Sequence, residues 1–388
     1  MFYNYLIFNM VTLSLRILLK YCVSLRRSIS FISIVMKKIL VFLFLIKCSF
    51  SFAQNVDLTS VDEFFKIADC LKNGKEVNME QWHQFDSSAA YSIFSDYKDN
   101  RISNIVKSTM QSVFGDLNRD KESENIISLE SLVRANYEEI NENYLKIKEF
   151  RHSYDFGSLI SNAKSRLQSF LGCDSLDTSV KWKPVYFLFL SADGKDMDDA
   201  LVIDFNLIYK MTEEQRINFL AHEFFHVYRG HFENHEFNYA NDINFAIDMI
   251  ANEGIADQID KYMGYREYYS SIIGSKELAE EFVSLYSKAE QDITTLQTIL
   301  LQYADKQIDK NTCIDKLLEI YKYNGHALGF YMSNQIILAG LKQEMLKSFH
   351  NPYEFYRLYL LATNKNNGNL LSRKFLNYLK KTTEQYYQ

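Results

Sequence analysis

The sequence predicts a mainly helical protein with one small β-sheet, an α+β fold. The 388-residue chain contains only two prolines, so few positions interrupt a helix. Apolar residues recur at helical spacing over most of its length. Only two short stretches, residues 184–190 and 201–208, combine apolar, β-branched and aromatic residues in the manner of strands. Helices are therefore expected to surround a single small sheet.

The amino-terminal segment has the pattern of a bacterial secretory signal. Met36 and two lysines give a basic start, an apolar run follows, and small residues precede a predicted cleavage near Ala53. Because this signal begins at an internal methionine, residues 1–35 are interpreted as an incorrectly assigned upstream start, or else as an extended basic region. The apolar run is shorter than the ~20 residues of a spanning helix. We therefore expect a secreted or periplasmic protein without a stable membrane span, with a retained membrane anchor as the alternative.

Charge and cysteine content exclude two classes of protein. Removing residues 1–54 takes away seven basic and no acidic residues, so the formal charge moves from −6 to −13. This charge argues against a nucleic-acid-binding surface. Cys70, Cys173 and Cys313 remain, without a C-x-x-C pair, so at most one intrachain disulfide can form. A fold held together by several disulfides is therefore excluded. Stability must come from an apolar core, for which the chain is long enough.

Helices are predicted on both sides of the two strands. The amino-terminal ones cover residues 61–71, 89–114, 126–150 and 156–171, and the carboxy-terminal ones cover residues 276–303, 310–323, 329–349 and 352–362. The segment between the strands is polar and rich in turn residues. The predicted regions are a signal region 1–54, a helical region 55–178, a core 179–345 and carboxy-terminal helices 346–388.

The helix after the second strand carries the most informative motif. Thr212-Glu-Glu-Gln215 is a capping box that begins the helix, and Gly230 is its predicted end. Within it, His222-Glu223-Phe-Phe-His226 is an H-E-x-x-H sequence. Two imidazoles four residues apart lie on one helical face and can share a zinc ion, with the intervening carboxylate beside them.

A catalytic zinc site usually has three protein ligands, so the motif needs one more donor. Glu253 is the predicted one, because it lies on a second predicted helix, residues 241–263, that ends before Gly264. Gly254 follows it directly and indicates a close backbone approach, since glycine costs about 1 kcal/mol in a helix interior. Asp257, one turn further, is predicted to accept the free N–H of a ligating histidine.

At these residues the chain resembles the gluzincin branch of the zinc metallopeptidases, in the MA clan, whose pattern is H-E-x-x-H followed by E-x-x-x-D on the next helix. Asn252-Glu-Gly-Ile-Ala-Asp257 is also similar to bacterial zinc-dependent peptidases of unknown function. The resemblance covers roughly residues 180–340. It implies a zincin-like core, a peptide or protein substrate and one zinc ion, with the ligands His222, His226 and Glu253, the general base Glu223, and Asp257 behind the ligands.

The expected chemistry is hydrolysis of a peptide bond. Zinc lowers the pKa of a bound water, and Glu223 takes the proton as this water attacks a carbonyl carbon and later delivers it to the leaving amine. The developing oxyanion needs one more donor. The resemblance implies a Tyr or His from a later helix, so Tyr323 and His326 are the candidates. An aromatic helix start packed in the core is an equally weighted interpretation of that segment.

Other residues near the motif have less specific interpretations. One of the two predicted strands is expected to be an edge strand that pairs with an extended substrate, and a hairpin that only covers the helices is an interpretation of at least equal weight. Asp204 and Asp242 are expected to be solvated carboxylates. His231 and His235 are also four residues apart, but no glutamate follows His231. They are expected at the surface or rim, with metal binding as the alternative.

Two further functions are compatible with the motif. The same metal, water and base would also open non-peptide electrophiles, so a non-peptide zinc hydrolase is one alternative. The other is a secreted binding protein in which a zincin fold has lost activity, and the intact Glu223 argues against it. No P-loop, G-x-S-x-G elbow, Rossmann glycine pattern or cysteine nucleophile competes for the chemistry.

Overall fold

The computed structural model describes residues 56–97, 101–115, 128–191, 193–273, 275–365, 371–384 and 386. All of them belong to one compact unit, Gln54–Gln388. Among these residues, no helix has the length and apolar character needed to span a membrane. The predicted secretory signal lies outside the described residues. Cys70, Cys173 and Cys313 are free thiols.

A four-stranded sheet has the order β1-β2-β4-β3. β1, β2 and β4 run parallel, and β3 is antiparallel to β4. Every residue of β4 is buried, as expected for an inner strand covered on both faces. The strands are β1 (Val56–Asp57), β2 (Val185–Leu188), β3 (Gly194–Asp196) and β4 (Leu201–Asp204). With helices in most of the remaining chain, the prediction of a mainly α fold with one small sheet is confirmed.

The two predicted strands occupy the interior of this sheet. β2 pairs with both β1 and β4, and β4 pairs with both β2 and β3. The prediction that one of them is an edge strand for substrate is therefore wrong, and so is the hairpin, because β2 and β4 are parallel. The edge strands are β1 and β3, and β3 lies in the segment expected to be a turn. It was missed because Gly194-Lys-Asp196 has no apolar alternation.

Asp204 ends β4 and begins the next helix, α10 (Phe205–Lys210). Its Oδ1 accepts the N–H of Leu207, the bond of a helix N-cap. Its Oδ2 accepts from the N–H of Leu190 and the side-chain amide of Asn136. The expectation of a solvated Asp204 is wrong, because the residue is 2% exposed and fully hydrogen-bonded. Because α10 begins at this cap, β4 ends at Asp204, four residues before the predicted end at residue 208.

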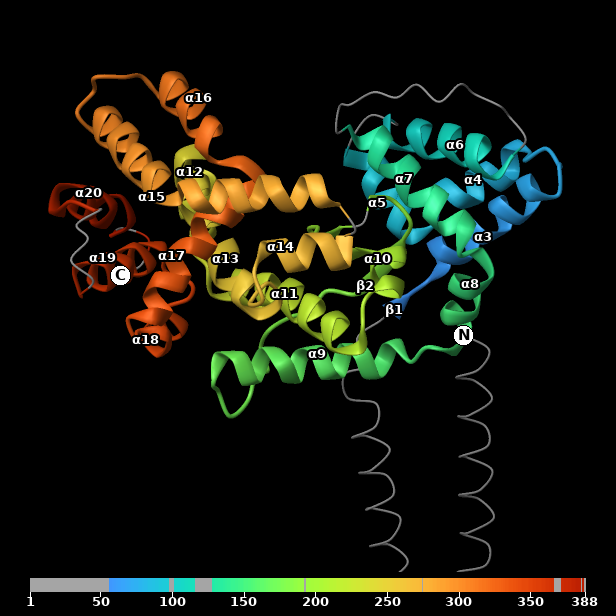
Figure 1. The fold of residues 1–388 in the computed structure, drawn as a ribbon, viewed down its shortest axis with the longest axis horizontal. Helices are drawn as coiled ribbons and strands as arrows, with labels where there is room; N and C mark the ends of the chain where they lie inside the picture. The colour runs from blue at the N-terminus through green and yellow to red at the C-terminus, as the bar shows by residue number, and fades with distance from the viewer. Residues whose placement is uncertain are drawn as a thin grey trace, which may run out of the picture. The chain divides into compact units, whose positions relative to one another are not determined.

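Helices of the amino-terminal half cover one end of the sheet. Two of them contact β2, and Phe64 packs its ring against Phe189, the residue after the strand end Leu188. Figure 1 shows α3–α8 gathered at one end of the unit. These helices and their neighbour are α3 (Thr59–Lys72), α4 (Met79–Asp86), α5 (Ala89–Tyr97), α6 (Arg101–Phe114), α7 (Leu129–Glu142), α8 (Tyr144–Ser153) and α9 (Phe156–Leu171). α9 has its predicted bounds, whereas the predicted helices 89–114 and 126–150 are each divided in two.

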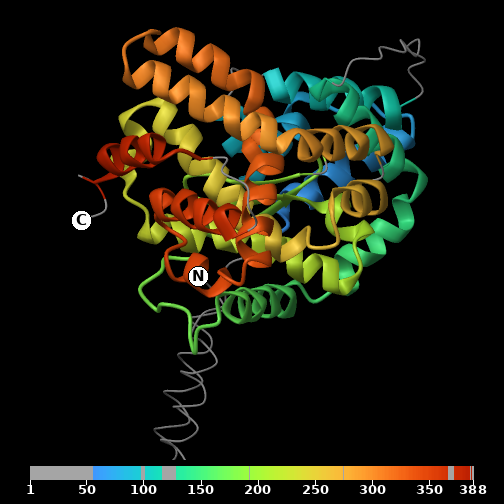
Figure 2. The same ribbon diagram turned by 60° about the vertical axis from the view of Figure 1, so that its left-hand side comes forward.

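The motif lies on α11 (Glu213–Phe232), whose N-cap Thr212 forms the predicted capping box with Gln215. The helix continues through Gly230, so the predicted end there is wrong. α13 (Asp242–Asp260) lies between α11 and α17 (His326–Leu338), as Figures 1 and 2 show. The other elements of this half are α12 (His235–Ala240), α14 (Tyr265–Tyr268), η1 (Tyr269–Ile273), α15 (Lys276–Ala304), α16 (Lys310–Ile320), η2 (Lys322–Gly325), α18 (Lys342–Lys347), α19 (Pro352–Lys365) and α20 (Arg373–Thr383).

α13 and α17 approach each other closely through two glycines. A Cβ atom added at Gly254 would lie 2.4 Å from the carbonyl carbon and oxygen of Gly329. A Cβ atom added at Gly329 would lie 2.0 Å from the carbonyl oxygen of Ile250. The close backbone approach expected at Gly254 is thus present, and it places the start of α17 beside Glu253.

Candidate metal centre

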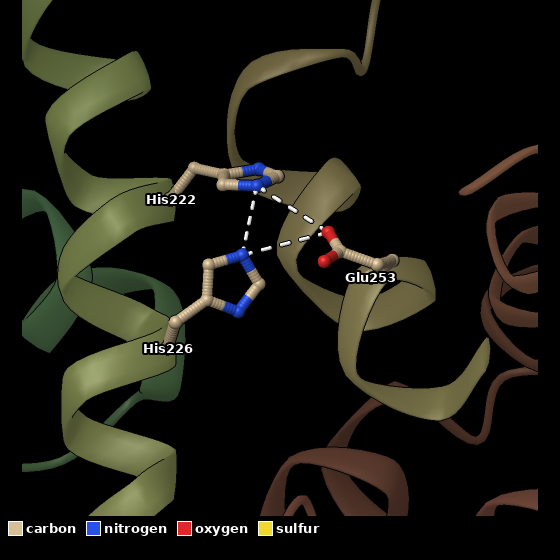
Figure 3. A group of neighbouring side chains, drawn as sticks. All are labelled: His222, His226 and Glu253. Atoms are coloured by element: carbon tan, nitrogen blue, oxygen red, sulfur yellow. Dashed lines mark hydrogen bonds and ion pairs between the residues drawn. The ribbon is translucent and has the colours of Figure 1, made fainter. Parts of the chain in front are cut away.

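Two helices bring the three predicted ligands together. His222 and His226 lie one turn apart on α11, and Glu253 faces them from α13 (Figure 3). The two imidazole Nε2 atoms are 3.1 Å apart. Glu253 Oε2 lies 3.7 Å from the first and 3.5 Å from the second. The helical spacing read from the sequence therefore places all three donors around one point.

The donor atoms fit a metal ion. Glu253 Oε2 is buried and has no hydrogen-bond partner among the described residues. Leaving a buried carboxylate oxygen unpaired is costly. The Nε2 atoms of His222 and His226 can share only one proton, and the hydrogen bond between them leaves Glu253 Oε2 without a partner. A cation among the three atoms would satisfy all of them, and two imidazoles with one carboxylate are a known donor set of catalytic zinc sites.

A polar side chain of α13 holds each of the two imidazoles from behind. His222 Nδ1 lies 2.9 Å from Asp260 Oδ1, and His226 Nδ1 lies 3.0 Å from Asn252 Oδ1. Such partners decide which ring nitrogen carries the proton and leave Nε2 free for a metal. Asp257, the predicted partner of a ligating histidine, is 3.7 Å from His222 Nδ1. Asp260 takes that place, and its position seven residues after Glu253, on the same helical face, was the available signal.

A third imidazole, His326 at the start of α17, closes the other side of the group. Its Nε2 lies 3.3 Å from Glu253 Oε2. Its Nδ1 lies 3.0 and 3.1 Å from the two oxygens of Asp257. Asp257 is fully buried and also accepts a hydrogen bond of 2.8 Å from the hydroxyl of Tyr265. The carboxylate predicted to orient a ligand therefore holds His326.

Tyr323 lies apart from these atoms. Its hydroxyl donates to Glu281 on α15 at 2.8 Å, and the side chain is 40% exposed. Tyr323 and Asn324 have positive φ angles of 49° and 54°, and Gly325 continues this left-handed turn up to His326. Of the two predicted oxyanion donors, the structure brings only His326 next to Glu253.

Glu223 is buried between the motif helix and the edge of the sheet. A Cβ atom added at Gly194 of β3 would lie 2.8 Å from Glu223 Oε1, so the strand backbone packs directly on the carboxylate. Burial raises the pKa of Glu223, while the neighbouring His222 and His226 lower it, and the net direction is upward. A carboxylate with a raised pKa accepts protons more readily near neutral pH.

Buried acidic groups outnumber the fixed cations of this centre. Burial by itself raises the pKa of Glu253, but His326 and His226 hold it well below its usual range. For His326, burial lowers the pKa, and Asp257 and Glu253 raise it more. Lys261 is the ammonium that pairs with two of the acidic groups. The remaining negative charge favours a divalent cation.

A known family model matches the segment that contains this centre. Residues 82–368, most of the chain, match the family described as "Putative zinc dependent peptidase (DUF5700)". The chain belongs to this family. Searches of curated proteins and of solved structures gave no match. Membership in the DUF5700 family supports the assignment of this chain to the zinc-dependent peptidases, which are hydrolases.

In this DUF5700 chain, a buried ion pair ties the motif helix to the ligand helix. Arg229 is fully buried, and its two terminal nitrogens lie 2.9 and 2.6 Å from the two oxygens of Asp248. Its Nε donates to the carbonyl of Phe349 at 2.9 Å. A bidentate pair of this kind fixes orientation as well as distance. Nothing in the sequence marks Arg229 as buried, because an arginine next to a polar stretch is normally at the surface.

The weaker candidates lie outside the centre. His231 and His235 are both exposed, and neither belongs to a metal-binding group within the described part of the chain. His231 Nε2 is 3.1 Å from the hydroxyl of Ser179. These positions agree with the surface interpretation. The side chain of Asp242 is 74% exposed, so it is a solvated carboxylate, as expected.

Proposed function

We propose that this protein is a zinc metallopeptidase of the gluzincin type with a zincin-like core. The observation that carries the proposal is the convergence of three imidazole Nε2 atoms on the buried, unpartnered Oε2 of Glu253. His222, His226 and Glu253 would hold one zinc ion. When bound, the ion acts as a Lewis acid that polarises a carbonyl group and makes a neighbouring water more acidic.

Glu223 is the proposed general base. Its carboxylate belongs to the same helix turn as the two histidines and is buried against β3. It would take a proton from the attacking water and pass it to the leaving amine. A proton acceptor with a raised pKa suits both steps, because it holds the proton between them.

β3 is the proposed binding strand for an extended substrate. It pairs on one side with β4 and forms one of the two edges of the sheet within the described residues. Gly194 of β3 contacts Glu223, so a peptide that extends the sheet at β3 would pass close to the general base. This assigns to β3 the role first expected of the two longer strands.

His326 is the proposed donor to the oxyanion. Asp257 holds its Nδ1, so a protonated His326 has its Nε2–H available on the side of Glu253. A donor fixed in place before the reaction stabilises developing charge without reorganisation. Tyr323, whose hydroxyl is bound to Glu281, has no such position.

The proposal is tested by the metal content and peptidase activity of the purified protein. We expect about one zinc per chain by plasma mass spectrometry. Glu253→Ala should lose the metal, whereas Glu223→Gln should keep it and lose hydrolysis of a peptide library. Glu63→Ala, in the distant helix α3, is the matched control and should behave as the wild type.

Each outcome has a defined meaning. A wild-type protein without zinc after reconstitution would overturn the metal site. Zinc that survives Glu253→Ala would overturn the third ligand. Zinc binding with hydrolysis of esters or other electrophiles, but of no peptide, would favour the non-peptide hydrolase. Zinc binding without any hydrolysis would favour an inactive binding protein.

Secretion and the regional borders are further parts of the proposal. Residues 36–53 are proposed as a cleaved secretory signal, with a retained anchor as the alternative. The borders near residues 178 and 345 remain predictions. Determining the amino-terminal residue of the protein exported by a bacterial host tests the cleavage near Ala53.

A further inference from the structure

Lys261 is a buried lysine at the carboxy-terminal end of α13, directly behind the metal centre. It is 5% exposed. Its Nζ lies 2.7 Å from Asp257 Oδ1 and 3.1 Å from Asp260 Oδ2, and it lies 4.8 Å from the centre of the Tyr268 ring. A lysine is rarely buried to this degree unless it is paired. This one is paired with two carboxylates at once.

The two carboxylates that share Lys261 hold different histidines. Asp260 lies 2.9 Å from Nδ1 of His222, on the motif helix. Asp257 lies 3.0 Å from Nδ1 of His326, on α17. One ammonium therefore connects the outer partners of two imidazoles that come from different helices.

The spacing along α13 explains this geometry. Glu253, Asp257 and Asp260 are separated by four and three residues, so they follow one face of the helix, and Lys261 follows Asp257 by four residues at the C-cap. The side chains of these three acidic residues are almost completely buried. Lys261 lies where the helix dipole also favours a cation. It is the amine that balances this acidic row.

We propose that Lys261 is a positioning residue that aligns His222 with the metal through Asp260 and His326 with the substrate through Asp257. This inference rests on the proposed zinc site. With Lys261 in place, both carboxylates keep a fixed orientation and both imidazoles keep Nε2 directed at Glu253. Without it, two adjacent buried carboxylates would repel each other and turn away from their histidines.

The first test measures zinc affinity of the purified protein by competition with a chelator. Lys261→Met keeps the length of the side chain and removes the charge and the donors. Because changes behind metal ligands typically cost 10- to 100-fold in affinity, we expect zinc to bind at least about tenfold more weakly. Lys261→Arg keeps the charge and should restore a large part of the affinity.

A matched control separates this role from the general loss of a lysine ion pair. Lys148→Met also removes a lysine that pairs with an aspartate, Asp69 at 2.6 Å, and that lies over aromatic rings. It lies on α8, away from the centre, and should leave zinc affinity unchanged. Absorption spectra of the cobalt-substituted proteins provide a second readout. Of the two variants, only Lys261→Met should change the shape of the absorption bands of the bound cobalt.

A double variant tests the route through Asp260, and it also reduces the buried negative charge that destabilises Lys261→Met. Asp260→Asn alone should weaken zinc binding. If Lys261 acts on His222 through Asp260, Lys261→Met should add little further loss in the Asp260→Asn background. A full additional tenfold loss in the double variant would overturn the proposed route.

The outcomes distinguish this inference from the proposed function. Lys261→Met with wild-type zinc affinity and an unchanged cobalt spectrum would overturn the role of Lys261 while leaving the zinc site intact. A wild-type protein that binds no zinc would overturn the zinc site itself. Loss of affinity in Lys148→Met as well would show a general stability effect and would also overturn the positioning role.

Discussion

The chemistry of each histidine in this centre depends on the residue behind it. His222 has Asp260, His226 has the neutral Asn252, and His326 has Asp257. A carboxylate behind an imidazole favours its charged form more than an amide does. The three rings therefore face the same point with different groups behind them, two carboxylates and one amide.

Replacing the two candidate oxyanion donors should separate their roles. His326→Ala should lower kcat/KM for a cleaved peptide at least about 100-fold, because a donor to the developing charge is lost. Tyr323→Phe should stay within about twofold, since its hydroxyl is bound to Glu281. Steady-state kinetics on zinc-loaded protein of both variants measures this. The reverse order of effects would assign the donor to Tyr323.

At the scale of elements, the centre depends on how closely α13 and α17 pack. Gly254 and Gly329 lie in mutual backbone contact, and this contact places His326 next to Glu253. The sequence indicated that Gly254 meets another backbone, because glycine is otherwise unfavourable inside a helix. It did not indicate the partner, since Gly329 lies in a segment with two equally weighted interpretations.

Alanine at either contact glycine should destabilise the protein. The added methyl group would overlap backbone atoms that cannot rotate away, so we expect a loss of at least about 2 kcal/mol in the free energy of unfolding for Gly254→Ala and for Gly329→Ala. Gly230→Ala is the matched control, because its Cβ would meet no atom within 4 Å. It should stabilise α11 by about 0.5–1 kcal/mol. Denaturant unfolding of the three variants measures these differences, and equal stability of all three would contradict the close contact.

At the scale of the whole molecule, the centre joins segments that are distant in the chain. Its side chains come from α11, α13 and α17, and β3 packs on Glu223. A metal ion held between α11 and α13 would therefore link the central helices of the unit. Binding to the folded state alone must then raise the stability of the whole protein.

Zinc should raise the melting temperature of the purified protein. At free zinc about 1,000 times Kd, binding adds about 4 kcal/mol to the folded state, which corresponds to a rise of several degrees. Thermal unfolding with zinc and with a chelator measures the difference. His226→Ala should show no such shift, because it removes one of the ligands. An equal shift in the variant would mean that zinc binds elsewhere.

The sequence by itself determined the local part of this site. Helical periodicity and the capping box placed His222 and His226 on one face of α11, and the apolar pattern placed Glu253 on the next long helix. The mainly helical class followed from the same periodicity and the shortage of proline. These predictions succeeded because the geometry of a helix fixes how residues three and four apart are placed, whatever the helix packs against.

Only the tertiary structure decided which partners these residues have. It assigned Asp260 to His222 and Asp257 to His326, placed His326 rather than Tyr323 beside Glu253, buried Asp204, and made β3 an edge strand. Several acidic, aromatic and strand-forming residues in this chain have equivalent local patterns. The choice among them depends on packing between elements that are distant in sequence, where burial and hydrogen bonding of whole helices and strands determine which side chains meet.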